Sequence, residues 1–530
     1  MRPTPPPYRI IYNWDGAPHG YDEVPQSMES FLERVFAPLE QTQVGALFWC
    51  VGEHAARWPS EALEQLGDIH GRRYEGAYSL THTENIRLLL ERGEDPQAAL
   101  IERGRSLGLQ VYASVRMNDN HFNGAQIADL PTLHHTELTE LRRRHPEWLL
   151  GSRTSEWFAL SWDMSVPEVR RHRLDHVREV CERYDWDGVE LDWQRHAFHL
   201  PEDDAFRLRY VITDLQRAAR RCADEIGRKR GRPLFVAARV AGNLHVCEQI
   251  GYDLPAWLEE GLVDIVIPAG NGGTDDDVDV AGFTDLCRPH GVAVYPGFDG
   301  GLPGPWVGPE PEAEKDRLRT RAIAARHWHH GADGIYAFNW HAGRENRREL
   351  LNQVGSPESL AVTDKVHAAT HRVLRHEGEW RGAYDNDRVR GTVPVALKET
   401  ITGGGPVIYL DVADDFETHP PRALELRLHL QDWVRGDEVA VRWDGAELAE
   451  PTLTYDTTGD RHGLSGVHAA AWVRFPLTAG QVKGGRHRVE VILRQRHPQL
   501  ASDLVLTDVE LVVAYSEALA GTLLGSSGSP

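Results

Sequence analysis

Two carboxylates, Glu190 and Asp192, stand two positions apart in the short apolar stretch GVELD at residues 188–192. Side chains on a β-strand alternate between faces, so both acids point to one side while Val189 and Leu191 point to the other. Because burying an unpaired carboxylate costs free energy, such a strand is expected to use its acids or to pair them. Two neighbouring carboxylates can divide acid/base or nucleophilic chemistry between them.

Short apolar stretches of strand length alternate with helical patterns between residue 8 and about residue 355. The predicted strands are residues 8–12, 44–50, 110–115, 188–192, 234–240, 264–268, 292–296 and 334–338. Apolar strands separated by helices are typical of a parallel sheet that is covered on both faces. The pattern predicts an α/β fold, a (β/α)8 TIM barrel, with a doubly wound sheet as the alternative.

The active site of a (β/α)8 barrel lies at the carboxyl ends of its strands. In this chain the predicted ends carry Asn13, Trp14, Asp15, Glu53, Arg116, Asn118, Asp119, His121, Glu190, Asp192, Trp193, Arg195, Arg239, Asn243, Asn271, Asp299, Asn339, Trp340 and His341. Several carboxylates at a barrel mouth suit glycosidic cleavage, in which one protonates the leaving oxygen and another acts as nucleophile or activates water. Tryptophans there can stack on sugar rings, and Asn or Arg can bind hydroxyl groups.

From about residue 385 the pattern changes to strict alternation of apolar and polar residues. The segments VIYLDV, LELRLHL, VAVRWDG, AAWVRFPL, HRVEVIL and VELVVAY are separated by turns rich in Gly, Asp and Pro. This pattern is typical of an all-β sandwich. We therefore predict a catalytic barrel with a terminal helix at residues 1–380, a C-terminal β-sandwich at 381–518, and a disordered tail at 519–530.

The 530-residue chain has a formal net charge of -22, which argues against a nucleic-acid or acidic-membrane partner because a polyanion would be repelled. No apolar run is long enough to span a bilayer, and the stretch MRPTPPPYRI has no apolar h-region of the kind found in signal peptides. The sequence thus predicts a soluble, cytoplasmic protein, with a removed signal peptide and the oligomeric state left open.

The sequence predicts neither a metal nor another cofactor. Its five cysteines are scattered and show no CxxC spacing. His327, His329 and His330 fall at a predicted helix end, where cationic side chains are favoured without any metal. No GxGxxG or Walker pattern follows a strand, so no nucleotide is implied.

The stretch YDWDGVELDWQRH resembles the fourth-strand motif of the family-10-like glycosyl hydrolases, in which a DG-x-x-LD pattern ends the strand. Here that pattern is Asp187, Gly188, Leu191 and Asp192. The resemblance extends to SVRMNDNH, RRHPEWLLG and GADGIYAFNWH, and so covers most of residues 8–355. It implies a barrel glycoside hydrolase with an accessory sandwich, acting on a poly- or oligosaccharide that the family does not specify.

DGVELDWQ is also similar to the DG-x-D-x-D-x-E motif of family-18 chitinases. At the positions of the second Asp and the catalytic Glu, this chain has Glu190 and Gln194. Gln cannot donate a proton as a general acid, so the comparison argues against a chitinase mechanism.

Four carboxylates are candidates for catalysis. Asp192 is the first, as nucleophile or acid, with the capping of a loop as its structural alternative. Glu190 is either a second catalytic acid or the holder of an arginine in a buried ion pair. Asp119 and Asp299 are candidate partners of Asp192, although their segments, RMNDNH and GFDGG, also suit ordinary turns.

The candidate substrate-binding residues are Trp14, Arg116, Asn118, His121, Trp193, Arg239, Asn271, Asn339, Trp340 and His341. Arg116 and Arg239 can bind a substrate carboxylate, as in a uronic or sialic acid, or can neutralise Glu190 and Asp192. The three tryptophans can be sugar platforms or barrel packing.

The sequence as a whole predicts a glycoside hydrolase with a carbohydrate as its partner. The first alternative is a lyase or isomerase that uses His or Tyr to remove a proton next to a uronate carboxylate. The second is a non-catalytic glycan-binding protein that binds through its sandwich. Sequence does not give the separation of the carboxylates, so retention or inversion stays open.

Overall fold

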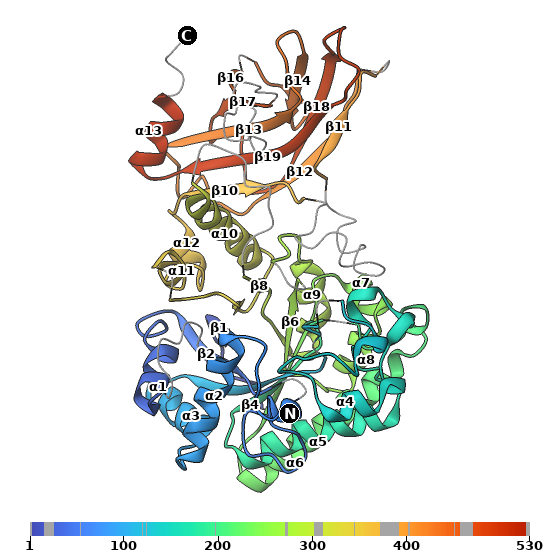
Figure 1. Ribbon diagram of the computed structural model, residues 1–530. Helices are drawn as coiled ribbons and strands as arrows, with labels where there is room; N and C mark the ends of the chain where they lie inside the picture. Colours follow the sequence, from blue (N-terminus) through green and yellow to red (C-terminus); the bar gives the residue numbers. More distant parts are fainter. Residues whose placement is uncertain are drawn as a thin grey trace. The chain divides into compact units, whose positions relative to one another are not determined.

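The computed structural model describes residues 3–14, 26–52, 55–118, 120–122, 124–196, 198–270, 274–300, 311–343, 345–371, 392–400, 403–449, 451–455 and 470–525. These residues form two compact units (Figure 1). We call the first, residues 3–300 and 330–351, the barrel unit. We call the second, residues 311–329, 352–371 and 392–525, the sandwich unit.

The barrel unit contains one sheet in which every paired strand is parallel. Its strands are β1 (Ile10–Trp14), β2 (Val44–Cys50), β3 (Gln110–Arg116), β4 (Gly188–Asp192), β5 (Phe235–Ala241), β6 (Ile265–Ala269), β7 (Ala293–Val294), β8 (Gly297–Asp299) and β9 (Ile335–Phe338). Neighbours in the sheet follow chain order from β1 to β7, and β9 pairs with β1. The expected (β/α)8 class is confirmed, and the sequential order rules out the doubly wound alternative.

The seventh position of the barrel is filled by two short strands rather than by the single predicted strand 292–296. β7 pairs with β6, whereas β8 pairs with β9, so the two together close the sheet. Only Tyr295 and Pro296 lie between them. Proline has no N–H to donate to a ladder, which explains the interruption at this point. The closure brings Asp299 to the carboxyl end of β8.

Helices separate the strands of the barrel unit. They are α1 (Met28–Phe36), α2 (Ala77–Glu91), α3 (Pro96–Ser106), α4 (Glu140–Arg144), α5 (Pro167–Arg183), α6 (Arg209–Arg230), α7 (Leu244–Gln249), α8 (Leu254–Glu259), α9 (Val280–Cys287) and α11 (Glu345–Leu350). α5 and α6, which flank β4 in the chain, pack side by side (Figure 1). α2 lies in the long segment between the predicted strands 44–50 and 110–115, where the strand pattern predicts no element.

The first half of the DG-x-x-LD motif has a structural role at the amino end of β4. The Asp187 carboxylate accepts hydrogen bonds from Val111 N (2.8 Å), Arg105 (2.8 Å) and Arg232 (3.0 Å), which ties β3 to β4. Gly188 lies against the Tyr112 ring, in a space that a Cβ atom would overlap. These two residues therefore set the position of β4, which carries Glu190 and Asp192.

Gly188→Ala is expected to lower the free energy of unfolding by about 1–3 kcal/mol, because the added methyl group displaces the buried Tyr112 ring. Thermal unfolding measures the loss. Gly76→Ala is the matched control, since nothing lies within 4 Å of the Cβ it would add. Equal melting temperatures for the two variants would contradict this account of the motif.

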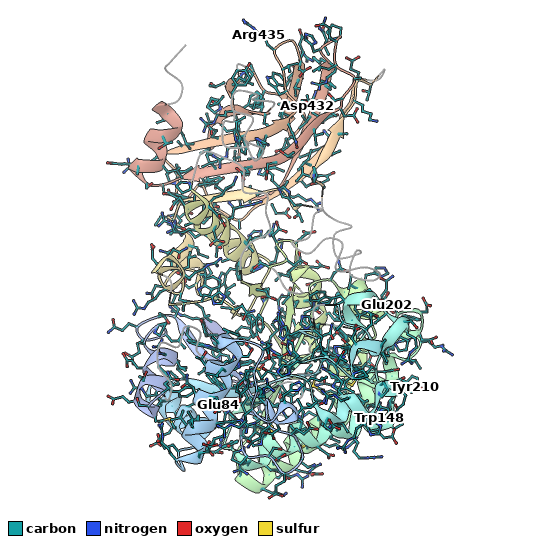
Figure 2. All side chains as sticks on the ribbon, viewed as in Figure 1. Glu84, Trp148, Glu202, Tyr210, Asp432 and Arg435 are labelled. Atoms are coloured by element: carbon teal, nitrogen blue, oxygen red, sulfur yellow. The ribbon has the colours of Figure 1, made fainter. Side chains whose placement is uncertain are left out.

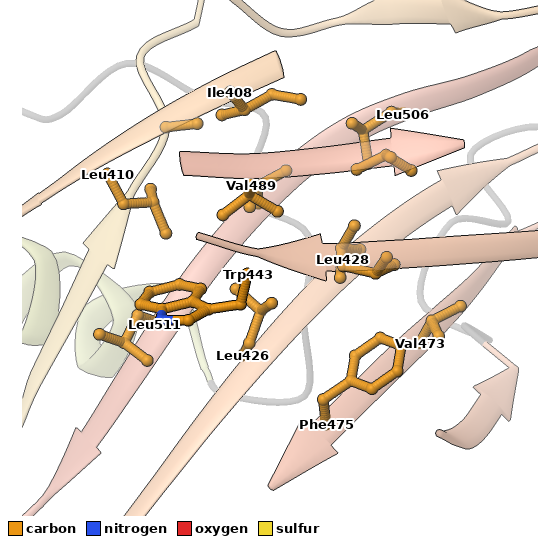
Figure 3. Packing of buried hydrophobic residues seen from close by; sticks show 14 of the residues in the cluster. Ile408, Leu410, Leu426, Leu428, Trp443, Val473, Phe475, Val489, Leu506 and Leu511 are labelled. Atoms are coloured by element: carbon orange, nitrogen blue, oxygen red, sulfur yellow. The ribbon is translucent and has the colours of Figure 1, made fainter. Parts of the chain in front are cut away.

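The sandwich unit contains two antiparallel sheets, as expected from the alternating segments. Its strands are β10 (Lys365–Ala368), β11 (Val395–Leu397), β12 (Val407–Val412), β13 (Ala423–Gln431), β14 (Glu438–Trp443), β15 (Ala446–Glu447), β16 (Thr452–Tyr455), β17 (Ala470–Leu477), β18 (Gly485–Gln495) and β19 (Leu504–Ala514). One sheet has the order β10-β19-β13-β17-β16, with β11 also on β19, and the other β12-β18-β14-β15. Their facing side chains, among them Leu426, Leu428, Trp443, Val489 and Leu511, form one apolar core (Figure 3).

Three elements that the sequence pattern places in the barrel domain group with the sandwich unit. They are the short helix α12 (Pro357–Leu360), β10, which pairs with β19, and α10 (Glu312–His329), which packs on β10. Lys315 of α10 forms a buried ion pair with Glu510 (2.9 Å), and Arg427 donates to the same carboxylate (2.6 Å). The domain boundaries after residues 380 and 518 therefore stay a prediction.

The prediction of a disordered tail from residue 519 is wrong for residues 519–525. This segment belongs to α13 (Glu517–Gly525), and α12 (Pro357–Leu360) is the other short helix of this unit. Ser516 Oγ accepts a hydrogen bond from Leu519 N (3.2 Å), in the manner of an N-cap. Ala520 and Leu523, three positions apart, are buried against α10, β10 and β19, and their burial stabilises the helix.

Within the described part of the chain, none of the helices combines the length and the apolarity needed to cross a bilayer.

Candidate active site

Glu190 lies inside the barrel, fully buried, and is held by side chains from three other strands. Its Oε2 accepts hydrogen bonds from Asn13 Nδ2 (3.0 Å) and from Ser114 Oγ, and its Oε1 accepts one from Tyr336 Oη (2.7 Å). Residues that point into the barrel alternate along each strand, so these four share one level of its interior. The donors of Glu190 are therefore an amide and two hydroxyls, not the arginine that the sequence alternative supposed.

Burial, followed by the nearby charge of Asp192, raises the pKa of Glu190 to about 7. The hydrogen bonds from Ser114 and Tyr336 act in the opposite direction but do not cancel these two effects. A carboxyl group of this kind carries its proton up to neutral pH, which is the state that a general acid requires.

Asp192, at the tip of β4, is buried and accepts four hydrogen bonds. The backbone N–H groups of Gln194 (3.0 Å) and Arg195 (2.9 Å) donate to Oδ1, and Arg239 Nη1 lies 3.1 and 3.2 Å from its two oxygens. Arg239 Nη2 lies 3.1 Å from Asp299 Oδ2, so one guanidinium joins both carboxylates. The Thr274 hydroxyl accepts from Asp299 N (3.0 Å) and so holds the tip of β8.

Although burial lowers the pKa of Arg239, the charges of Asp192 and Asp299 raise it above its ordinary value. The guanidinium therefore stays charged and places one positive charge between the two carboxylates. Glu190 and Asp192 thus lie in contrasting environments, since Glu190 accepts from neutral donors and Asp192 is paired with a guanidinium.

Arg239→Met is expected to lower the free energy of unfolding by about 3–5 kcal/mol, because it leaves two buried carboxylates without their cation. Urea denaturation measures the change. Arg207→Met is the control, since Arg207 pairs with Asp204 at the surface (2.7 Å, side chain 74% exposed) and is expected to contribute less than about 1 kcal/mol. Similar losses in both variants would show that Arg239 does not hold the pair.

Three guanidinium groups lie over the Phe338 ring at the end of β9. The guanidinium carbons of Arg239, Arg116 and Arg195 are 4.3, 5.3 and 5.6 Å from the ring centre. A cation above an aromatic face is attracted by the ring quadrupole. Phe338 therefore helps to gather the arginines of β3, β5 and the β4 tip in one place.

Beside this cluster is a cavity of about 370 Å³, which we call the loop cavity. It is lined by Arg57, Leu66, Glu75, Tyr78, Ser79, His82, Thr83, Arg116, His121, His135, Thr136, Glu137 and Arg195. Its size falls within the range of small-molecule sites. Arg116 and Arg195 connect it to the barrel mouth, and the two insertions after β2 and β3 supply the rest of the wall.

The wall of the loop cavity formed by α2 is fixed by its own hydrogen bonds. Glu84 of α2, labelled in Figure 2, accepts hydrogen bonds from Arg72 Nε (2.9 Å) and from the Tyr74 hydroxyl. Glu75 accepts from Ser79 Oγ (2.6 Å) and from Thr136 N (3.0 Å), which joins the two insertions. The wall is thus built from contacts within the barrel unit.

His121 lies in the loop cavity between a carboxylate and a guanidinium. Its Nδ1 is 2.9 Å from Glu137 Oε2, and its Nε2 is 2.8 Å from Arg195 Nη2. Arginine can only donate, so Nε2 accepts, and the ring proton on Nδ1 is donated to Glu137. The imidazole therefore presents a basic nitrogen toward the side of the cavity that faces the barrel mouth.

Several sequence candidates lie in packing positions instead of at a surface. Asn118 uses its amide on the backbones of Trp162 and Phe198. Trp193 is fully buried and donates to Gln216 (3.0 Å), and Trp340 is 1% exposed and donates to Arg347 O (2.8 Å). None of these three is among the residues that line the loop cavity.

The remaining sequence candidates divide into three cases. Trp14 is half-buried and packs on Tyr12 and Trp49. Asn339 and His341 follow β9 with left-handed backbone angles (φ 48° and 54°), which are uncommon outside glycine. Asp119 and Asn271 lie outside the described residues.

Sequence reasoning missed the hydroxyls of Ser114 and Tyr336 and the cavity residues Arg57, Tyr78 and Glu137. A signal for the first two was present, since each lies two positions before a strand end and so shares the face of the residue there. Arg57, Tyr78 and Glu137 lie in insertions, where strand alternation gives no guide.

No protein-family model matches the chain, and a search of curated proteins gives no significant match. The family resemblance inferred from the motifs therefore stays a prediction.

Solved structures to which the chain is similar include glycoside hydrolases. The GH36 alpha-galactosidase AgaA from Geobacillus stearothermophilus is 13% identical over 96% of this chain and 56% of that chain, with a TM-score of 0.34. The alpha-galactosidase TtGalA from Thermus thermophilus is 16% identical over 69% and 64%, with a TM-score of 0.33. A GH18 N-acetylglucosaminidase from Paenibacillus barengoltzii is 13% identical over 66% and 100%, with a TM-score of 0.35.

The chain spans about half the length of AgaA. At these identities and TM-scores the likeness carries no conclusion on substrate, reaction or catalytic residues.

Proposed function

We propose that the protein is a glycoside hydrolase that cleaves glycosidic bonds at the mouth of the barrel. The observation that carries this proposal is the contrast between two carboxylates on β4. Burial raises the pKa of Glu190 to about 7, whereas Asp192 accepts hydrogen bonds from the Arg239 guanidinium and from two backbone N–H groups. Glycosidic cleavage requires such a pair, one carboxylic acid and one carboxylate.

In this proposal Glu190 supplies the proton for the leaving oxygen, and Asp192 acts as nucleophile or activates water. Arg239 is a positioning residue, because it bridges the carboxylates of Asp192 and Asp299 and fixes their orientation. Asp299 is the second candidate anion. Asp119 stays a candidate catalytic carboxylate because of its place in the sequence, after the third predicted strand. The substrate enters beside Arg116 and Arg195, which line the loop cavity.

The test is a panel of neutral and acidic oligosaccharides, assayed both for new reducing ends and for unsaturated products. Reducing ends without unsaturation, lost in Asp192→Asn, are expected. Cleavage that persists in both Asp192→Asn and Glu190→Gln would overturn the assignment.

One observation favours a second candidate, a lyase or isomerase acting on a uronate-type sugar. The His121 Nε2, backed by Glu137 on the opposite ring nitrogen, accepts from Arg195 in the loop cavity, so it takes a substrate proton only when Arg195 turns to the sugar carboxylate. A base next to guanidinium groups suits removal of the proton adjacent to a sugar carboxylate. Unsaturated or isomerised products that disappear in His121→Ala would establish this reaction in place of hydrolysis.

A further inference from the structure

Gln194, two residues beyond Asp192, has a side-chain amide without a hydrogen-bond partner among the described residues. Its side chain is fully buried, and neither Nε2 nor Oε1 bonds to another group in that part of the chain. A buried amide that loses its bonds to water and gains none in return destabilises the folded state. Such a group in a native structure calls for an explanation, and a role in binding or catalysis is one.

The backbone next to this amide is held by hydrogen bonds on both sides. The N–H of Gln194 donates to Asp192 Oδ1 (3.0 Å). The carbonyl group of Trp193 accepts from His199 Nε2 (2.7 Å) and from the Tyr252 hydroxyl (2.6 Å). The peptide group that joins Trp193 to Gln194 is therefore fixed, and the amide belongs to an ordered segment. A group that is already ordered binds a ligand with little further loss of entropy.

Gln194 follows Asp192 on the inner side of the barrel. Trp193 N donates to Arg239 O (3.1 Å), so the ladder between β4 and β5 continues one residue past Asp192. The Trp193 indole donates to Gln216 of α6 (3.0 Å), which places this side chain on the helix side of the sheet. Because side chains alternate along a strand, the next residue returns to the side that carries Asp192.

Two side chains that bond to the acids of β4 also contain a polar atom without a partner among the described residues. Asn13 donates to Glu190 through Nδ2 (3.0 Å), and its Oδ1 is unpartnered. Arg239 pairs with Asp192, and its Nε is unpartnered. Both side chains are buried. The carboxylates are thus accompanied by unused donors and acceptors, a combination that suits hydroxyl groups, which both donate and accept.

We propose that Gln194 is a substrate-binding residue, whose amide forms hydrogen bonds with a hydroxyl group of the sugar ring that reacts beside Asp192. The proposal rests on the proposed function for the reaction, but the state of the amide is measurable without any substrate. A sugar hydroxyl accepts from Nε2 or donates to Oε1, and the neutral amide adds no charge next to the carboxylate. A site with a buried polar group left for a hydroxyl discriminates against ligands that lack it.

The first experiment compares three buried glutamines by urea denaturation, each replaced by methionine, which is similar in size and has no amide. Gln194→Met is expected to have a urea midpoint equal to or above that of the wild type, because no hydrogen bond is lost. Gln216→Met is expected to have a lower midpoint, since Gln216 accepts from Trp193 and donates to Leu262 O (3.4 Å). Gln26→Met is expected to behave like Gln194→Met, because the amide of Gln26 is also unpartnered among the described residues.

The second experiment measures kcat/KM for the glycan that is cleaved in the panel. Gln194→Met is expected to lower kcat/KM at least about 10-fold, the effect of losing one or two hydrogen bonds to substrate. Gln26→Met is the control, because its backbone N–H donates to Asn85 of α2 (2.9 Å) and not to a carboxylate of the barrel mouth. Its kcat/KM is expected to stay within about 2-fold of the wild type, since it removes an amide that contacts no substrate. A merely structural role of Gln194 would not combine retained stability with lost activity.

A midpoint for Gln194→Met as low as that of Gln216→Met would overturn the proposal, because the amide would then have a partner in the protein without substrate. Cleavage with an unchanged kcat/KM in Gln194→Met would remove the contact and leave the hydrolase.

If no glycan is cleaved, calorimetric titration of the full chain with maltose, cellobiose and melibiose replaces the kinetics. Binding that is weakened several-fold in Gln194→Met would keep the contact and remove the hydrolase. Equal binding in both proteins, or none in either, would overturn both proposals.

Discussion

Asp192→Asn is expected to lower kcat/KM for the cleaved glycan by at least about 10³-fold while leaving its binding within a few-fold of the wild type. The amide keeps the size of the side chain and can still accept from the backbone of Gln194 and Arg195, but it has no negative charge. Catalytic carboxylates and bases contribute about 10²–10⁴-fold each, and a lost nucleophile costs at the upper end. Steady-state kinetics with the glycan identified in the panel measures the change.

The matched control for this variant is Asp185→Asn, seven residues earlier in the same motif. Asp185 is exposed, and its carboxylate pairs with Arg105 (2.7 Å) and Arg232. It precedes the amino end of β4, whereas Asp192 is at the carboxyl end. Its loss is expected to change kcat/KM by less than about 2-fold, since surface ion pairs contribute little. A non-catalytic glycan-binding protein would instead show the same binding in both variants and no turnover in either or in the wild type.

The DG-x-x-LD motif at residues 187–192 contains residues with different roles. The alternation of Val189, Glu190, Leu191 and Asp192 was sufficient to place both acids inside a barrel, because a strand has only two faces. Gly188 owes its identity to the Tyr112 ring, a contact between strands that only the register of β3 with β4 defines. Sequence thus predicted which residues face inward, but not which of them meet.

The hydrogen-bond partners of Glu190 and Asp192 could not be predicted from the sequence either. Arg239 was expected to neutralise Glu190 and Asp192, whereas in the structure its hydrogen bonds go to Asp192 and Asp299. The difference arises because Asp299 lies on β8, the strand that pairs with β9 where the barrel closes. The ion pair between Arg239 of β5 and Asp299 of β8 forms only in the closed sheet, so no local sequence pattern predicts it.

Elements outside the barrel strands were harder to predict for a related reason. The apolar positions of α10 show that it must pack on something, yet they do not identify β10 as the surface. α2 and the loop cavity depend on contacts between two insertions, such as Glu75 with Thr136, that lie about sixty residues apart. Local periodicity fixes the type of an element, and long-range packing fixes its partner.

Glu190→Gln is expected to remove the alkaline limb of the pH–rate profile. In the wild type the proposed acid is protonated below its pKa of about 7, so kcat/KM falls as the pH rises through that value. The side-chain amide of the variant cannot act as a general acid, so the residual activity is expected to be about 10²–10⁴-fold lower and flat between about pH 6 and 8. Rates measured across this range in both proteins, with Asp185→Asn as the control, test the assignment.

The same substitution is expected to change the pH dependence of stability, with a sign that follows from the raised pKa. In the folded wild type Glu190 binds its proton more tightly than in the unfolded chain, where the ordinary value is 4.5. The resulting stabilisation, about 3 kcal/mol, is fully present below pH 4.5 and is lost as the pH rises through about 7. Glu190→Gln removes this contribution to the slope, so its free energy of unfolding falls less between about pH 5 and 8.

Urea denaturation at several pH values measures both slopes and separates two explanations of a lost alkaline limb. If Glu190 is the proton donor, the limb and the stability slope disappear together, because both report one titrating carboxyl group. If the slope disappears while the limb persists, another group supplies the proton, and the acid must be sought among the other carboxylates of the mouth. If both persist, the buried carboxyl group of Glu190 does not titrate near neutral pH, and the division of roles on β4 is wrong.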